Sequence, residues 1–446
     1  MTQTWETGWR AQIPTLLANQ NWDLLIIGGG ITGAGILLEA ARNGLQALLV
    51  EQRDFAWGAS SRSSKLVHGG LRYIQQGKLH LTRDSVHERQ QLLRDAPGLV
   101  TEQSFAFATY RGKKPGRWLF SVGLALYDRM AKQHQRHYYP NDEFLMLAPH
   151  IQTTGLQGGL CYTDAKTDDA RLVLRVLQEA QVAGGYALNY TGVSELLRHE
   201  GRIDGARLLD VASGTNFDIG ARVVINATGA WGDALRPASS TPTQRPHLRP
   251  LRGSHLIFLA WRLPVAQAIS LMHPTDGRPV FAFPWEGVTL VGTTDVDHRA
   301  DLRDEASITA DEVNYLMTAL HAQFPQLGLT PDDILSTYAG VRPVIASGKA
   351  NPSQETREHA IWLEDGLLSV TGGKLTTFRL IALDALRHAA PFLPDWHANL
   401  SKKPVFARTP SLPFSTSLGT QQRLRLEGRY GQNASLLVAA AQENEL

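Results

Sequence analysis

Asp23–Gly33 reads DLLIIGGGITG, an apolar run that leads directly into glycines with the spacing GxGxxG. The run predicts a short strand buried on both faces, and the residues after Gly33 predict a helix. The glycines permit a tight turn and let the backbone approach a diphosphate at the positive end of the helix. Glu51 closes the next predicted strand about 20 residues later, where a carboxylate accepts hydrogen bonds from a ribose diol. The segment therefore predicts a dinucleotide-binding fold, with these cofactor-binding residues: Gly28, Gly30, Gly33 and Glu51.

Further strands and helices extend this unit. Short apolar runs bounded by glycine predict one parallel sheet built from distant segments: Asp23–Ile27, Ala47–Val50, Val223–Asn226 and Leu367–Val370. Pro279–Pro284 and Val288–Gly292 flank a tight turn and predict an antiparallel hairpin of a second sheet. Helical periodicity covers roughly Gly33–Asn43, Leu81–Arg94, Asp169–Ala183, Ala310–Phe324 and Thr377–Ala389. The fold class expected is α/β, or α+β overall, with a Rossmann-like domain assembled from discontinuous segments beside an antiparallel-sheet domain.

The composition limits the classes of function. The chain of 446 residues is 43% hydrophobic and has a formal net charge of +2, which gives no reason to expect nucleic acid as a partner. The single cysteine, Cys161, excludes an internal disulfide and a cysteine metal cluster, and no metal site is expected. Met1–Asn21 lacks the apolar run of a signal peptide, and Trp22–Ala41 is too polar and glycine-rich for a spanning helix. We therefore expect a cytoplasmic protein.

The loop after the second predicted strand distinguishes between dinucleotides. Residues 58–73 read GASSRSSKLVHGGLRY and combine hydroxyls, cations, a histidine and glycines. Hydroxyls and backbone amides suit a second phosphate, and the glycine pair lets the chain pass close to a flat ring. The loop favours FAD over NAD and adds these cofactor-binding candidates: Ser60, Ser61, Lys65, His68 and Gly69.

From this loop onward the sequence resembles the FAD-dependent, quinone-linked glycerol-3-phosphate dehydrogenases, a branch of the D-amino acid oxidase superfamily. The resemblance runs from about Trp22 to Ala389, and these segments carry it: Leu126–Asp128, Thr163–Asp164, Asp168–Leu172, Asn226–Trp231, Gly253–His255, Phe283–Gly287, Gly292–Asp295, Gly340–Pro343 and Gly372–Thr377. It implies oxidation of sn-glycerol 3-phosphate to dihydroxyacetone phosphate, by hydride transfer from carbon 2 to N5 of the flavin. It also implies that the electrons pass to a quinone and that the protein docks on the cytoplasmic face of the inner membrane.

The resemblance also implies roles for individual side chains. Arg72, Tyr73, Arg342 and Arg357 match positions that bind the substrate, and arginine suits a phosphate because it donates two parallel hydrogen bonds. His255 is the candidate general base, because its ordinary pKa lies near neutrality, and the sequence leaves open whether Arg342 shares this role. Lys374 and the helix amides that follow it would stabilise negative charge on the reduced ring. The remaining cofactor-binding candidates are Gly229, Gly373, Leu375 and Thr376.

The domain boundaries expected from these segments are as follows. The FAD-binding domain takes residues 22–100, 150–250 and 335–390, and the substrate-binding domain takes 101–149 and 251–334. Members of the family usually continue into a further helical domain, so residues 391–446 are expected to form a linker and a short helical tail of a truncated C-terminal domain. The basic and aromatic segment Arg111–Phe120 is a candidate membrane contact, with a basic turn before a core helix as the alternative.

Three alternatives remain open on sequence alone. The first is an oxidase of the same fold that passes electrons to oxygen. The second is an enzyme of this fold that oxidises an amine or a 2-hydroxy acid, because a carboxylate also pairs with arginine. The third is a flavin-binding protein without catalytic activity. The sequence also leaves open whether the chain forms a homo-oligomer.

Overall fold

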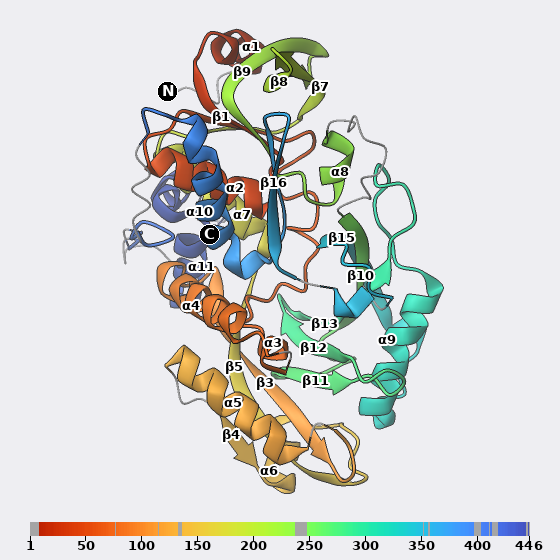
Figure 1. Cartoon of the computed structure of the whole chain (residues 1–446). Helices are drawn as coiled ribbons and strands as arrows, with labels where there is room; N and C mark the ends of the chain where they lie inside the picture. Colours follow the sequence, from red (N-terminus) through yellow and green to blue (C-terminus); the bar gives the residue numbers. More distant parts are fainter. Residues whose placement is uncertain are drawn as a thin grey trace.

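The computed structural model describes residues 9–75, 77–114, 116–132, 136–236, 248–350, 352–355, 357–396, 403–409, 411–412, 418–442 and 445. The described chain is built around two sheets that lie next to each other, with helices packed on their outer faces (Figure 1).

The first sheet is mainly parallel. Its strand order is β16 (His359–Glu364), β17 (Leu367–Gly372), β9 (Thr215–Asn226), β1 (Trp22–Ile27), β2 (Ala47–Val50) and β6 (Tyr186–Leu188). Only β16 runs antiparallel to its neighbour on this path, and β7 (Thr191–His199) and β8 (Arg202–Asp210) extend β9 as an antiparallel ribbon. The central strands β1 and β2 are apolar and almost fully buried, as is the end of β9 (Val223–Asn226), as expected for parallel strands covered on both faces.

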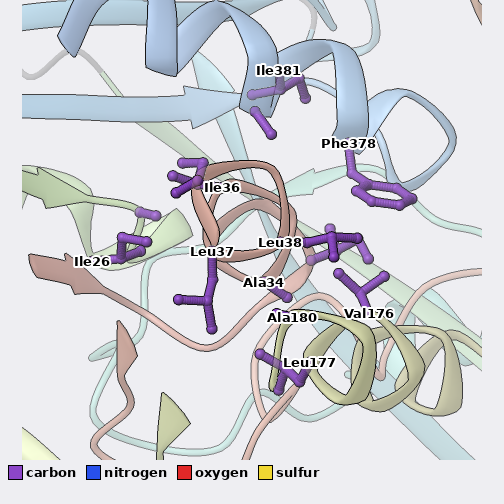
Figure 2. Packing of buried hydrophobic residues seen from close by; sticks show 14 of the residues in the cluster. Ile26, Ala34, Ile36, Leu37, Leu38, Val176, Leu177, Ala180, Phe378 and Ile381 are labelled. Atoms are coloured by element: carbon purple, nitrogen blue, oxygen red, sulfur yellow. The ribbon is translucent and has the colours of Figure 1, made fainter. Parts of the chain in front are cut away.

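Three helices cover one face of this sheet. They are α2 (Ile31–Arg42), α7 (Asp169–Val182) and α10 (Phe378–Ala389). Figure 2 shows α2 in the middle, with Leu37 facing Leu177 of α7 on one side and Leu38 facing Phe378 of α10 on the other. A side chain at Gly35 would lie 2.8 Å from the Phe378 ring, so the glycine lets α2 and α10 pack closely.

The second sheet is mainly antiparallel. Its order is β14 (Val296–Asp297), β10 (Leu248–Leu259), β13 (Val288–Gly292), β12 (Pro279–Trp285), β11 (Ala268–Met272), β3 (Val100–Tyr110), β5 (Leu156–Thr167) and β4 (His137–Tyr139). In addition, β15 (Ile334–Ile345) pairs with β10. A second apolar core joins this sheet to α6 (Asn141–Leu147) and α9 (Ala310–Gln323). The other described helices are α1 (Trp9–Ala18), α3 (Leu71–Gln75), α4 (Leu79–Asp95), α5 (Arg117–Ala131), α8 (Gly232–Leu235), α11 (Thr420–Tyr430) and α12 (Ala434–Ala440).

The structure confirms the expected fold class, strands and helices. The four apolar runs lie in β1, β2, β9 and β17 of one sheet, and the expected hairpin is β12–β13. The proposed division into domains stays a prediction. Two strands do not belong to the sheet that this division implies for them. β5 and β15 fall in ranges assigned to the FAD-binding domain, yet both pair within the second sheet. The sequence of a strand does not by itself say which sheet it joins, because its partners come from distant parts of the chain.

Helix α11 packs against α7, one of the helices that cover the first sheet. Arg175 of α7, almost fully buried, donates from Nη1 to the carbonyl oxygens of Glu427 and Gly428 in α11, at 3.1 and 2.9 Å. Arg429 reaches Asp168 at the start of α7 and Glu286 in the β12–β13 turn, both at 3.3 Å. The helix α11 therefore connects elements of both sheets. In the described part of the chain, every helix is too short or too polar to cross a membrane.

Candidate active site

A pocket of about 690 Å³ lies between the two sheets, and its walls come from both. This volume is within the range of pockets that bind cofactors and small ligands. Gly28, Glu51 and Thr228 of the first sheet's loops line one part, and Arg342 and Lys374 line another. The pocket therefore joins the predicted cofactor residues to the predicted substrate residues.

The glycine turn before α2 has no room for side chains. Gly28 has a φ of +115°, and a Cβ there would lie 2.6 Å from the carbonyl oxygen of Ala227. A Cβ on Gly33 would collide with the carbonyl oxygen of Gly28, so Gly33 supports the turn from behind while Gly28 and Gly30 line the pocket. The backbone and the start of α2 can therefore approach a diphosphate directly.

Glu51 lies at the end of β2, as predicted, and lines the pocket. Its Oε2 accepts a hydrogen bond from the Gly29 amide at 2.8 Å, and its Oε1 accepts one from the Arg53 amide at 2.9 Å. Burial raises the pKa of Glu51 above its ordinary value. The carboxylate is thus fixed beside the glycine turn, where a ribose diol would lie.

The loop that follows β2 divides into residues that face the pocket and residues that hold the loop. Ser60 and His68 line the pocket, and Ser60 Oγ accepts from the Ile31 amide at 3.0 Å. Ser61, Lys65 and Gly69, also predicted to bind the cofactor, lie outside the pocket wall. Lys65 donates from Nζ to Asp169 at 2.7 Å and to the Ser61 carbonyl oxygen at 3.1 Å. Lys65 therefore stabilises the loop from the side away from the pocket, because its ammonium is attracted to the buried carboxylate of Asp169.

A buried network that sequence reasoning did not identify holds Gly69. Asp164 Oδ1 accepts from the Gly69 amide at 3.1 Å and from Arg89 Nη1 at 2.7 Å, while Oδ2 accepts from the Tyr127 hydroxyl at 2.9 Å. Burial raises the pKa of Tyr127, so the hydroxyl stays a donor. Asp164 and Tyr127 both fall in motifs that carried the family resemblance, and that was the available signal.

Lys374 and His68 face the same region of the pocket. Lys374 donates from Nζ to Ser85 Oγ at 2.9 Å and lies 3.9 Å from the centre of the Tyr73 ring. Burial lowers the pKa of Lys374 to about 7. Burial, followed by the nearby Lys374 charge, lowers the pKa of His68 to about 4, so this ring is neutral although it is open to the pocket. The other predicted residues that line the pocket here are Tyr73, Gly229, Gly373, Leu375 and Thr376.

Three arginines converge on one carboxylate in the pocket wall. Asp295 Oδ1 accepts from Arg342 Nη1 at 3.2 Å, and its Oδ2 accepts from Arg357 Nη2 at 2.7 Å. Arg278 Nη2 lies 3.7 Å from the same Oδ2. Burial lowers the pKa of Arg342 to about 10, which still leaves it charged. Sequence reasoning identified Arg342 and Arg357 but missed Arg278 and Asp295. The side chain of Arg72 lies outside the described part of the chain.

His255 lies in β10 and is fully buried, away from the pocket wall. Its Nε2 is 2.9 Å from Ser64 Oγ, and its ring stacks on Tyr338 at 4.5 Å between centroids. Its Nδ1 has no hydrogen-bond partner among the described residues. Burial, then the charges of Arg342 and Lys65, hold the pKa of His255 well below its usual value. The predicted general base therefore reaches the pocket only through Ser64. Among the described residues, no group of three or more histidine, cysteine or acidic side chains could hold a metal ion.

Comparison with known proteins identifies relatives of the whole arrangement. Residues 23–382 match the model of the FAD dependent oxidoreductase family. The aerobic glycerol-3-phosphate dehydrogenase of Bacillus subtilis (strain 168) is 38% identical over 377 residues, which cover 84% of this chain and 67% of that protein. The protein of the same name from Staphylococcus aureus (strain USA300) is 37% identical over 380 residues, 84% of this chain and 68% of that one.

Solved structures agree with these matches. The glycerol-3-phosphate dehydrogenase from Bacillus halodurans complexed with FAD superposes with a TM-score of 0.75 at 30% identity, covering 98% of this chain and 81% of that chain. L-alpha-glycerophosphate oxidase from Mycoplasma pneumoniae has a TM-score of 0.65 at 18% identity, covering 88% and 99%, and shows a shared fold. The glycine turn, the pocket and these matches agree, and the chain belongs to the FAD-dependent oxidoreductase family.

Proposed function

We propose that this protein is an FAD-dependent dehydrogenase that oxidises sn-glycerol 3-phosphate to dihydroxyacetone phosphate. The observation that carries the proposal is the arginine cluster, in which Arg342 and Arg357 line the same pocket as the glycine turn and Glu51. Guanidinium groups suit a phosphate because they donate bidentate, charge-assisted hydrogen bonds. The relatives named as glycerol-3-phosphate dehydrogenases support the same substrate.

The described residues that line the pocket suit FAD. Gly28 and Gly30 leave the space that a diphosphate needs, and Glu51 would hold the ribose. Gly373 and Lys374 line the other part of the pocket, where the flavin ring would be held. When bound, FAD supplies the acceptor for a hydride from the substrate carbinol.

The substrate would be bound by its phosphate and oriented by its hydroxyl. Arg357 and Tyr73 would bind the phosphate, together with Arg72. Arg342 would donate to the oxygen at carbon 2, because Thr293 Oγ1, the Thr294 carbonyl oxygen and Asp295 fix its guanidinium from one side. A fixed cation beside that oxygen stabilises the negative charge that develops as the hydroxyl ionises.

We assign the proton of that hydroxyl to Lys374. Lys374 lines the pocket, and burial lowers its pKa to about 7, so an unprotonated amine is available near neutral pH. His255 is a poor acceptor, since a positive charge on its buried ring would lie unscreened near Arg342 and Lys65. The neutral His255 instead orients Ser64, which lines the pocket.

The direct test is anaerobic mixing of the FAD-loaded protein with sn-glycerol 3-phosphate while the visible absorbance of the flavin is followed. Rapid bleaching is expected with this substrate, and none with glycerol or lactate. Bleaching by lactate instead would contradict the proposal and favour a 2-hydroxy acid. Peroxide released in air would identify an oxidase.

We propose further that electrons pass to a quinone and that α5 docks on the cytoplasmic face of the inner membrane. Trp118, Leu119 and Val122 are 80%, 71% and 66% exposed on this helix, next to the cations of the preceding turn. Aromatic and apolar side chains beside cations suit the surface of an anionic bilayer. Trp118→Ala should weaken binding to anionic liposomes, whereas Trp261→Ala, which removes an equally exposed tryptophan elsewhere, should not. Equal binding by both variants would exclude α5 as the contact.

A further inference from the structure

Three guanidinium groups surround the single carboxylate of Asp295 in the pocket wall. Asp295 follows β13, is 7% exposed, and forms ion pairs with guanidinium groups from three separate parts of the chain. Arg278 precedes β12, Arg342 belongs to β15 and Arg357 precedes β16. All four side chains line the pocket. One carboxylate shared by three guanidinium groups leaves two positive charges without a counter-charge.

The remaining described charges of the pocket do not change this balance. Asp164 is paired with Arg89, Glu358 with Lys78 and Arg62 with Glu305. Glu51 lies beside the glycine turn at the part assigned to the ribose. Although burial favours the neutral form of Asp295, Arg357, Arg342 and Arg278 outweigh it and lower the pKa of the carboxyl, so Asp295 stays ionised. Lys374, with a pKa of about 7, is neutral in a large fraction of molecules near neutral pH.

Two uncompensated charges in a partly enclosed pocket disfavour the empty state, because like charges repel strongly where water screens them poorly. A ligand with two negative charges compensates both positive charges, whereas a ligand with one compensates only one of them. A phosphate monoester carries its second negative charge above pH ~6, while a carboxylate or a sulfate ester carries one at any neutral pH.

We propose that Arg278 and Asp295 are specificity-determining residues: they give the described cluster around Asp295 an excess of two positive charges, which selects a doubly charged phosphate ester. Arg278 supplies the second unbalanced charge, and Asp295 both limits the total and orients Arg342 and Arg357 through hydrogen bonds. The inference rests on the proposed function, because it concerns the substrate class of the same pocket. It distinguishes a phosphate ester from the 2-hydroxy acid that the sequence left open.

The test uses methyl phosphate and methyl sulfate, two anions of similar shape that lack an oxidisable carbinol. Their binding to the FAD-loaded protein is measured by calorimetry between pH 5 and 8. Methyl phosphate should bind at least about tenfold more tightly than methyl sulfate above pH ~6, and this preference should shrink below it as the phosphate loses its second charge.

Arg278→Gln removes one charge, and the preference for methyl phosphate should fall by about tenfold, as expected for the loss of one charge-assisted contact. Arg278→Lys keeps the charge and should keep most of the preference. The control is Arg303→Gln, which removes an arginine that is 88% exposed and paired with Asp301 outside the pocket. An unchanged preference in Arg278→Gln, or a preference lost equally in Arg278→Lys, would overturn the proposal.

Asp295→Asn keeps the shape of the side chain and raises the unbalanced charge. Methyl sulfate should then bind at least as tightly as in the unchanged protein, and flavin reduction by substrate should slow by about tenfold or more, because Arg342 loses the contact that orients it. Weaker binding of methyl sulfate would mean that Asp295 acts only through packing, and would overturn its assigned role. If the anions behave as expected but glycerol 3-phosphate does not reduce the flavin, the charge selection stands and the proposed reaction fails.

Discussion

Gly28 is the residue at which conformation and space act together on cofactor binding. Its φ of +115° strains any other residue, and a Cβ would also lie 2.6 Å from the Ala227 carbonyl oxygen. We expect Gly28→Ala to lower FAD affinity by at least about tenfold, since strain of this kind costs on the order of 1–3 kcal/mol. Gly184→Ala is the matched control, because Gly184 has a φ of +98° but nothing within 4 Å of its Cβ position. Equal FAD content in both purified variants would show that the collision at Gly28 is unimportant.

Lys374 gives the proposed reaction a defined pH dependence. Burial lowers the pKa of Lys374 to about 7, so its amine loses the proton as the pH rises through this value. At saturating substrate, the rate constant of flavin reduction should therefore rise between about pH 6 and 8 and then level off. Lys374→Met should abolish this rise and slow reduction by about 10²-fold or more. A variant with the same pH profile as the unchanged protein would move the proton to another group.

The site residues that the sequence could predict are those whose signal is local. Gly28 and Glu51 follow from the spacing of one strand, turn and helix, and the structure brings both to the pocket. Arg278 and Asp295 could not be found this way, because their roles depend on each other and on Arg342 and Arg357, which lie in other parts of the chain. His255 shows the converse. The residue type suited a base, but burial, which the sequence does not reveal, keeps its ring neutral and off the pocket wall.

At the scale of elements, the start of α7 connects the loop after β2 to the helices that cover the first sheet. Asp169 is fully buried and accepts from the Lys65 ammonium and from both the amide and the hydroxyl of Ser63. The periodicity of the sequence predicted α7 well, because periodicity records which face is buried. It could not predict that β5, which leads into this helix, pairs with the second sheet, since strand partners are set by the whole chain.

Loss of the Lys65–Asp169 ion pair should lower the stability of the protein. Asp169→Ala leaves the Lys65 ammonium buried without its counter-charge, and we expect a loss of about 3–5 kcal/mol in the free energy of unfolding. The double variant Lys65→Met and Asp169→Asn should recover part of this loss, because it removes the unpaired charge. Denaturant unfolding of the three proteins measures both values. A double variant that is less stable than Asp169→Ala would show that the ion pair itself is not what stabilises the loop.

At the scale of the whole molecule, α11 contacts α7 and the β12–β13 turn, which are far apart in the sequence. Arg175 anchors the helix by donating to its last turns, and Arg429 connects it to both sheets. Arg175→Ala should release α11, because the two carbonyl oxygens lose their donor and the helix buries few apolar residues of its own. Limited proteolysis should then cut the tail faster while the rest of the chain stays intact. Gln421→Ala, at an exposed position of the same helix, is the control, and equal cleavage of both variants would contradict this role of Arg175.

Asp168 and Asp169 are consecutive residues with separate partners: the first is bound by Arg429 of the tail, and the second holds Ser63 and Lys65 in the cofactor loop. A ligand that orders the loop also fixes Asp169, and through the shared backbone it fixes the residue that receives the tail. Because a ligand stabilises the conformation to which it binds, loss of the cofactor should loosen α11 before the core unfolds. Resistance of α11 to proteases should therefore report whether the pocket is filled.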